Sequence, residues 1–199
     1  MPNQQSPINL TNQITLTEFK KPLKIRWSKH LEGSIAKDHG FSIRFSGDKR
    51  ERISFDGLDF QIIQYHFHHK SEHWLDGKQF PLELHMVHQN CDVQGGGIAV
   101  LGVFIDSEKK PRGSSRLVQK TSGSPLETNP RRWLPSDVSH YFRYEGSLTT
   151  PGYDENVSWI VFPQPLLLPK ADIRWLIRHA AQPARLPQPI SRRFVLANF

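Results

Sequence analysis

The sequence predicts a mainly β protein, a single strand-dominated domain of residues 1–199 with a few short peripheral helices. Three observations support this prediction. Apolar and polar side chains alternate with a period of two in several segments, as they do along a strand with one buried face. Turn-forming residues separate these segments, and helical periodicity is weak. A length of 199 residues suits one domain with a sizeable core.

Seven segments carry the strand pattern. In chain order they are Leu23–Trp27, Phe41–Phe45, about Asp59–His69, Phe80–His88, Ile98–Asp106, Val157–Phe162 and Phe194–Phe199. Turn signals lie between them, at Ser46-Gly47-Asp48, Asp56-Gly57, Asp76-Gly77, Gly95-Gly96-Gly97 and Thr150-Pro151-Gly152. These signals mark where one strand ends and the next begins.

Helical patterns are confined to two short segments. Ala171–Ala181 follows Pro169 and places Ile173, Leu176, Ile177 and Ala180 on one face, which predicts a short helix. Ser114–Lys120 is expected to form one or two further helical turns, and Pro125–Pro135 an irregular loop. The helices are therefore expected at the periphery of the strands.

Composition excludes several classes of protein. The net charge is +7, but the Lys and Arg residues are scattered and no nucleic-acid-binding motif accompanies them, so a solvated basic surface is the better interpretation. No apolar run is long enough to span a membrane. Met1–Leu10 is polar and does not read as a signal peptide. The single cysteine, Cys91, excludes an internal disulfide and a cysteine-based zinc finger.

The stretch YHFHHKSEHW, residues 65–74, holds four of the ten histidines. Side chains two apart on a strand point to the same face. His66 and His68 therefore share a face with Gln64, and Phe67 points oppositely. Two imidazoles about 7 Å apart along one strand face can converge on one ion, but they need a third ligand from elsewhere.

The next predicted strand offers that ligand, because Glu83, His85 and Val87 share one of its faces. The turn signal at Asp76-Gly77 favours a hairpin that sets the two strands side by side. Three neutral imidazoles with a free fourth position are typical of a catalytic zinc site. Glu83 and Gln64 are then placed to orient the ligand histidines. A structural polar cluster is the alternative, and the remaining histidines of these strands are not expected to bind metal: His69, His73 and His88.

These residues resemble the core signature of the α-class carbonic anhydrases. The resemblance covers nearly the whole chain, with matching motifs at Gln64–His68, Ser71-Glu72-His73, Glu83–His88, Gln5-Ser6-Pro7-Ile8-Asn9, Gly97–Phe104, Gly146–Pro151, Val157–Val161, Arg185 with Gln188-Pro189, and Ala197-Asn198-Phe199. It is closest to the compact bacterial type, and the chain begins almost at the Gln5 motif, where family members usually carry a further segment. The fold it implies is a large twisted, mostly antiparallel central sheet.

The resemblance also implies roles for individual residues. His66, His68 and His85 match the Zn²⁺ ligands, and Gln64 and Glu83 match the residues that orient them. Glu72 and Thr149 resemble the pair in which the carboxylate accepts the threonine proton, and His39 matches the proton-shuttle histidine. The residues that match the substrate-binding wall are Val87, Val100, Leu148, Thr150, Val157 and Trp159.

The implied activity is reversible hydration of carbon dioxide to bicarbonate and a proton, by attack of zinc-bound hydroxide. The alternative is a carbonic-anhydrase-like binding protein with little or no catalysis. The expected partner is the small-molecule substrate, carbon dioxide or bicarbonate, with no nucleic acid and no membrane. A homodimer is the assembly to test for.

Overall fold

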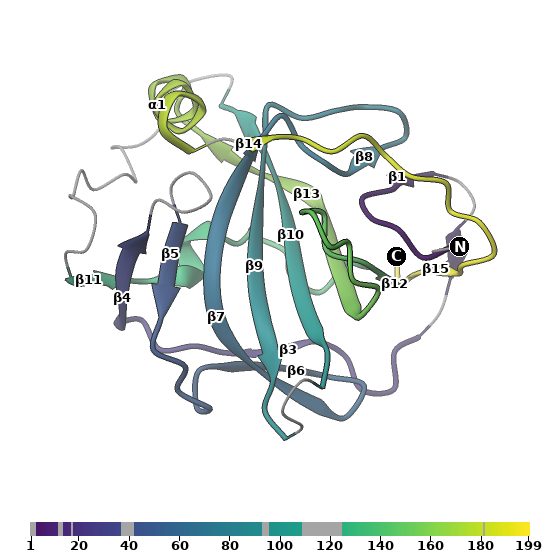
Figure 1. Ribbon diagram of the computed structural model, residues 1–199, viewed down its shortest axis with the longest axis horizontal. Helices are drawn as coiled ribbons and strands as arrows, with labels where there is room; N and C mark the ends of the chain where they lie inside the picture. Colours follow the sequence, from purple (N-terminus) through teal and green to yellow (C-terminus); the bar gives the residue numbers. More distant parts are fainter. Residues whose placement is uncertain are drawn as a thin grey trace.

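The computed structural model describes residues 3–11, 14–16, 18–36, 42–92, 96–108, 125–180 and 182–199. In these residues, one sheet holds thirteen strands, ten of them in a continuous path in the order β11-β4-β5-β7-β9-β10-β13-β12-β15-β2. The four long strands at its centre are β7 (Leu58–His69), β9 (Leu82–Asn90), β10 (Ile98–Ser107) and β13 (Val157–Leu168). Figure 1 shows β7, β9 and β10 crossing the middle of the molecule.

Short strands extend this centre on both sides. They are β2 (Ile14–Leu16), β3 (Lys24–Arg26), β4 (Leu31–Ala36), β5 (Ser42–Phe45), β6 (Arg52–Phe55), β11 (Pro125–Thr128), β12 (Phe142–Gly146), β14 (Gln182–Pro183) and β15 (Val195–Ala197). A separate small sheet joins β1 (Asn9–Leu10) to β8 (Trp74–Leu75). Most pairings are antiparallel, and the long parallel one joins β10 to β13. The predicted mainly β fold with a mostly antiparallel sheet is confirmed.

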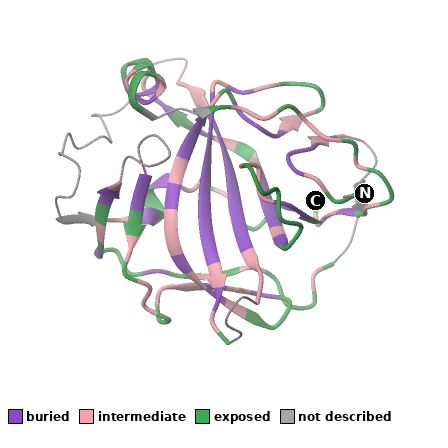
Figure 2. Ribbon diagram, viewed as in Figure 1, coloured by how far each residue is buried: buried purple, intermediate pink, exposed green. Residues whose placement is uncertain are grey.

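Both faces of the central sheet are buried, as the purple central strands in Figure 2 show. One hydrophobic cluster includes Phe67 and Met86, and a second includes Val87 and Trp159. Met86 and Val87 are neighbours on β9, so their alternation places one in each cluster. The face that carries the histidines is therefore covered by protein rather than open to solvent.

Helical structure is sparse in the described residues. They contain α1 (Lys170–Ala180) and one 3₁₀ turn, η1 (Pro130–Trp133). The helix predicted over Ala171–Ala181 is thus found one residue earlier, and Ala181 lies outside the described residues, as do Phe41 and the predicted turns at Ser114–Lys120. None of the helices in the described ranges is long and apolar enough to cross a membrane.

One prediction about the backbone was wrong, and one predicted strand was too short. The segment predicted as an irregular loop over Pro125–Pro135 contains β11 and η1. Proline at the first position of a strand at the end of the sheet path is compatible with pairing, because no ladder bond needs its N–H. The strand predicted over Val157–Phe162 continues to Leu168, past two prolines, along the parallel pairing with β10.

Candidate metal centre

The hairpin of β7 and β9 brings the three candidate ligands together. His66 lies directly opposite His85 in the antiparallel register, and His68 lies opposite Glu83. The ligand nitrogens of His66, His68 and His85 all lie within 4.8 Å of one another. Asp76 and Gly77, in the connection between the strands, both have positive φ angles, of 48° and 77°, as the turn signal predicts. The alternation of side chains along the two strands therefore identified three histidines whose ring nitrogens lie close together.

Glu83 fixes the orientation of two histidines. Its carboxylate is fully buried and accepts hydrogen bonds from the backbone N–H groups of Glu72 and His73, both at 2.8 Å. Its Oε1 also lies 2.7 Å from Nδ1 of His73 and 3.0 Å from Nε2 of His85. Burial raises the pKa of Glu83, but His73 and His85 outweigh it and bring the pKa well below its usual value. Since Nε2 of His85 donates to this carboxylate, Nδ1 carries the lone pair for a metal.

His68 shows that the site suits a metal ion. Its side chain is 3% exposed, and both of its ring nitrogens are buried without a hydrogen-bond partner in the part of the chain that the structure describes. An unsatisfied buried polar atom costs about 1–3 kcal/mol. Burial, with His85 and His66 close by, brings the pKa of His68 well below its usual value, so the ring is neutral. A neutral buried imidazole with a free lone pair is the form that Zn²⁺ binds.

Glu72 and Thr149 meet beside the triad. The Glu72 carboxylate is 2% exposed, accepts a hydrogen bond from the backbone N–H of Arg185 at 2.9 Å, and is hydrogen-bonded to the Thr149 hydroxyl. Burial raises the pKa of Glu72, while the hydrogen bond from Thr149 opposes that rise. Oε2 of Glu72 lies 3.7 Å from Nε2 of His68. The predicted pair is therefore in contact and next to a candidate ligand.

A cavity of about 220 Å³ opens over the three histidines. Its lining includes five of the six predicted substrate-binding residues, Val87, Val100, Leu148, Thr150 and Trp159, together with Gln64 and Thr149. Val157 belongs to the same hydrophobic cluster but does not line the cavity. Ile63 and Ile98 line it and were missed from the sequence. A register shift between Ile62 and Gln64 explains Ile63, because a bulge turns adjacent side chains to one side.

The other histidines have different surroundings. His88 faces the opposite hydrophobic cluster, where its ring stacks on Trp27 at 5.5 Å between ring centroids. Nδ1 of His69 lies 3.0 Å from the Pro81 carbonyl. His73 is fully buried between Glu83 and Tyr144, whose hydroxyl lies 2.6 Å from Nε2 of His73. His39 lies outside the described residues.

Sequence reasoning missed the partners of His73. The Tyr144 hydroxyl bonds His73 and also lies 2.9 Å from Oγ of Ser6, a residue of the N-terminal motif. Oγ of Ser6 in turn accepts the N–H of Ser147, which precedes Leu148 and Thr149. The motifs around Ser6, His73 and Ser147 were each recognised, but no local pattern indicated that they touch.

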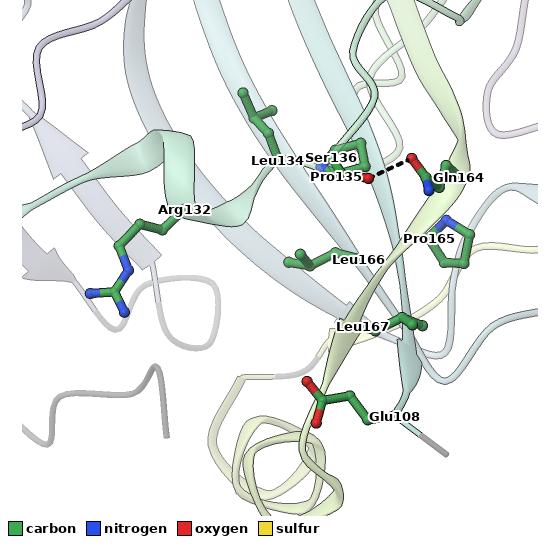
Figure 3. Close-up of a pocket in the computed structure, with 9 residues that line it drawn as sticks. All are labelled: Glu108, Arg132, Leu134, Pro135, Ser136, Gln164, Pro165, Leu166 and Leu167. Atoms are coloured by element: carbon green, nitrogen blue, oxygen red, sulfur yellow. Dashed lines mark hydrogen bonds between the residues drawn. The ribbon is translucent and has the colours of Figure 1, made fainter. Parts of the chain in front are cut away.

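A larger hollow lies away from the histidines, with a volume of about 500 Å³ (Figure 3). Its described lining contains Leu134, Leu166 and Leu167 between Arg132 and Glu108, without a histidine. Leu134 and Leu166 pack with the cluster of Phe67, on the opposite side of the sheet from the cavity wall. This hollow is therefore separate from the candidate metal centre.

Comparison with known proteins agrees with this site. The family of eukaryotic-type carbonic anhydrases matches residues 2–199. Carbonic anhydrase 7 of Homo sapiens is 31% identical over 236 aligned residues, covering 99% of this chain and 89% of the human protein. The structure of an α-carbonic anhydrase from Photobacterium profundum has a TM-score of 0.82 at 33% identity, covering 98% of this chain and 89% of that one.

A second solved structure is the α-carbonic anhydrase of Thermovibrio ammonificans in complex with the inhibitor sulfanilamide. Its TM-score is 0.79 at 29% identity, covering 98% of this chain and 87% of that chain. The chain belongs to the α-class, eukaryotic-type carbonic anhydrase family. Its triad of His66, His68 and His85 is typical of the zinc site at which that family hydrates carbon dioxide.

Proposed function

We propose that the chain catalyses the reversible hydration of carbon dioxide to bicarbonate at the triad of His66, His68 and His85. One observation carries the proposal. Three histidine nitrogens lie within 4.8 Å of one another in the lining of a partly apolar cavity, and the nitrogens of His68 have no hydrogen-bond partner among the described residues. Three neutral ligands and an open fourth position are what a catalytic zinc site needs.

When bound, Zn²⁺ lowers the pKa of water to about 7 and so supplies hydroxide at neutral pH, a value general to carbonic anhydrases. The protein supplies orientation. Glu72 accepts a hydrogen bond from the Thr149 hydroxyl, so the lone pairs of that oxygen remain free to accept a hydrogen bond from the nucleophile. We assign Glu72 and Thr149 this catalytic role.

The cavity wall binds the substrate. Val87, Val100 and Trp159 are at least nine-tenths buried and present apolar surface beside the histidines. An apolar wall suits carbon dioxide, which is uncharged, and does not compete for the metal. We assign substrate contact to these residues with Leu148 and Thr150, and proton transfer out of the site to His39. Val157 packs in the same hydrophobic cluster and is assigned to support the wall from outside the cavity.

Gln64 and Glu83 are assigned to hold the ligand rings. The supporting contact for Glu83 is its 3.0 Å bond to Nε2 of His85, which selects the tautomer that leaves Nδ1 for the metal. Gln64 lines the cavity two residues before His66 on the same strand. Loss of either side chain is expected to weaken zinc binding more than folding.

The test combines metal analysis with an assay of carbon dioxide hydration. The purified protein should carry one zinc per chain, and His85→Ala should lose both the metal and the activity, because two histidines hold zinc poorly. His69→Ala is the matched control, since His69 bonds a backbone carbonyl outside the triad, and it should keep both. Full zinc occupancy and activity in His85→Ala would refute the ligand assignment.

A carbonic-anhydrase-like binding protein without catalysis is the second candidate. It predicts bound zinc with no measurable hydration, so the same pair of measurements separates the two. The supporting contacts for an enzyme are those between Glu72, Thr149 and Arg185, which a purely binding role does not need. A homodimer remains a separate prediction, which light scattering of the purified protein would decide.

A further inference from the structure

The loop that carries Thr149 contains a turn held by backbone hydrogen bonds within the loop. This segment, residues 147–156, connects β12 to β13 and is called the threonine loop below. The N–H of Leu148 bonds the carbonyl of Asp154 at 3.0 Å, and the N–H of Tyr153 bonds the carbonyl of Thr150 at 3.0 Å. Tyr153 has a φ of 48°, a left-handed conformation that is unfavourable for a bulky side chain. Contacts from outside the turn can help to stabilise Tyr153 in this conformation.

Arg185 makes one such contact. Its guanidinium carbon lies 3.8 Å from the centre of the Tyr153 ring, a cation–π contact. Nη1 of the same guanidinium donates to the carbonyl of Ser6 at 2.7 Å. The backbone N–H of Arg185 donates to Oε1 of Glu72 at 2.9 Å. Arg185 thus connects the threonine loop, the N-terminal segment and the carboxylate of Glu72, which accepts a hydrogen bond from Thr149.

The N-terminal segment strengthens this connection. Nε2 of Gln5 donates to the carbonyl of Tyr153 at 3.2 Å, and the N–H of Ser6 donates to Oγ of Ser147 at 2.9 Å. The N–H of Gln188 bonds the carbonyl of Pro7 at 2.7 Å. The C-terminal chain runs on from β14 in Figure 1 and is hydrogen-bonded to the N-terminal segment. That segment in turn contacts the threonine loop at Ser147 and at Tyr153.

We propose that Tyr153 and Arg185 form a clamp that positions the Thr149 hydroxyl against Glu72. Arg185 places the carboxylate through its backbone N–H, and Tyr153 holds the threonine loop against the same arginine. Neither side chain lines the cavity, so both are positioning residues that act through Glu72 and Thr149. The inference rests on the proposed hydration activity, since that activity gives the Glu72–Thr149 contact its purpose.

Kinetics of zinc-loaded variants test the clamp. Tyr153→Ala should lower kcat roughly tenfold, because loosening the loop spoils the orientation of the nucleophile, while KM and zinc content stay near the parent values. Tyr153→Phe keeps the aromatic ring and should restore most of kcat. The double variant with Arg185→Ala should be no slower than Arg185→Ala alone, since one contact cannot be lost twice. Phe194→Ala removes an aromatic side chain that is 75% exposed and should leave kcat unchanged.

Hydrogen exchange supplies a readout that does not depend on catalysis. In Tyr153→Ala, the amide of Leu148 should exchange roughly tenfold faster than in the parent, while amides of β9 keep their rates. An unchanged Leu148 amide, an equal loss of kcat in Tyr153→Phe and Tyr153→Ala, or additive losses in the double variant would each overturn the clamp. If the parent protein does not hydrate carbon dioxide, the proposed function fails, but the exchange of Leu148 still decides whether the clamp holds the loop.

Discussion

His88 should make the protein less stable in mild acid. The residue is fully buried on the face of β9 opposite the triad, where its ring stacks on Trp27 and its Nδ1 lies 3.3 Å from the carbonyl of Ala99. Burial lowers the pKa of His88 to about 3, and the backbone hydrogen bonds to Ala99 and Met86 offset only part of that shift. The ring is therefore neutral in the folded protein at any pH above about 4.

The sign of the effect follows from the two pKa values. In the unfolded chain the ring has its ordinary pKa of 6.5. Below pH 6.5 the unfolded state binds a proton that the folded state does not bind, so the free energy of unfolding falls as the pH falls. At pH 5, which is about 1.5 units below 6.5, the loss is about 2 kcal/mol at 1.36 kcal/mol per unit. This figure is insensitive to the folded pKa, provided that it lies well below 5.

Urea unfolding of the parent and of His88→Gln at pH 8 and pH 5 measures this loss. Glutamine cannot titrate but still offers an N–H near the carbonyl of Ala99. The variant should be less stable at pH 8, and the gap in unfolding free energy should narrow by about 2 kcal/mol at pH 5. Contributions of other titrating groups, including the metal ligands, cancel in the difference. Ile62→Val, directly opposite His88 on β7, serves as a buried control. The difference in unfolding free energy between this variant and the parent should be the same at pH 8 and pH 5.

A gap between parent and His88→Gln that does not change with pH would refute the reasoning. It would mean that His88 is protonated in the folded state or that its surroundings open before global unfolding. A narrowing of similar size in Ile62→Val would point instead to a general loosening of the β7–β9 hairpin in acid.

Three further predictions concern the site. Glu83→Gln should weaken zinc affinity roughly 10–100-fold, measured by competition with a chelator, because an amide cannot accept all the donors that the carboxylate accepts; unaltered affinity would count against the role of Glu83. Thr149→Ala should keep its zinc but lose kcat on the order of a hundredfold, and normal turnover would exclude the assigned role. His39→Ala should slow turnover in dilute buffer, and added imidazole should restore it. If this variant matches the parent at every buffer concentration, His39 is not the shuttle.

Strand parity predicted the triad because the information is local. Two side chains of β7 and one of β9 lie on one face wherever those segments are extended, and the hairpin turn leaves little choice of pairing. Strand β4 was missed from the sequence, because Gly33 in its middle weakens the strand pattern. At Gly33 the backbones of β4 and β5 lie close together, and a Cβ there would lie 2.9 Å from the carbonyl oxygen of Arg44 on β5.

The contacts that complete the site could not be predicted in this way. Ser6 and Tyr144 are 138 residues apart, and their hydroxyls meet only because β12 and the N-terminal segment are folded over the same edge. Strand β12 itself shows alternation, but Arg143 is buried, with partners in Asp56 and Glu145, which hides the usual polar face. Such pairings depend on the tertiary fold, for which a single sequence offers no local signal.

The triad lies on a buried face of the sheet, so the polar side chains around it need partners within the protein. The histidines lie on a sheet face that is covered by protein, so burial of the Glu83 and His68 side chains carries a desolvation cost. The Glu83 carboxylate recovers that cost within the protein through its four hydrogen bonds. His68 does not, because neither of its ring nitrogens has a hydrogen-bond partner within the described ranges. A buried ligand histidine with both ring nitrogens unsatisfied is a sign that this face is built around a metal rather than for stability.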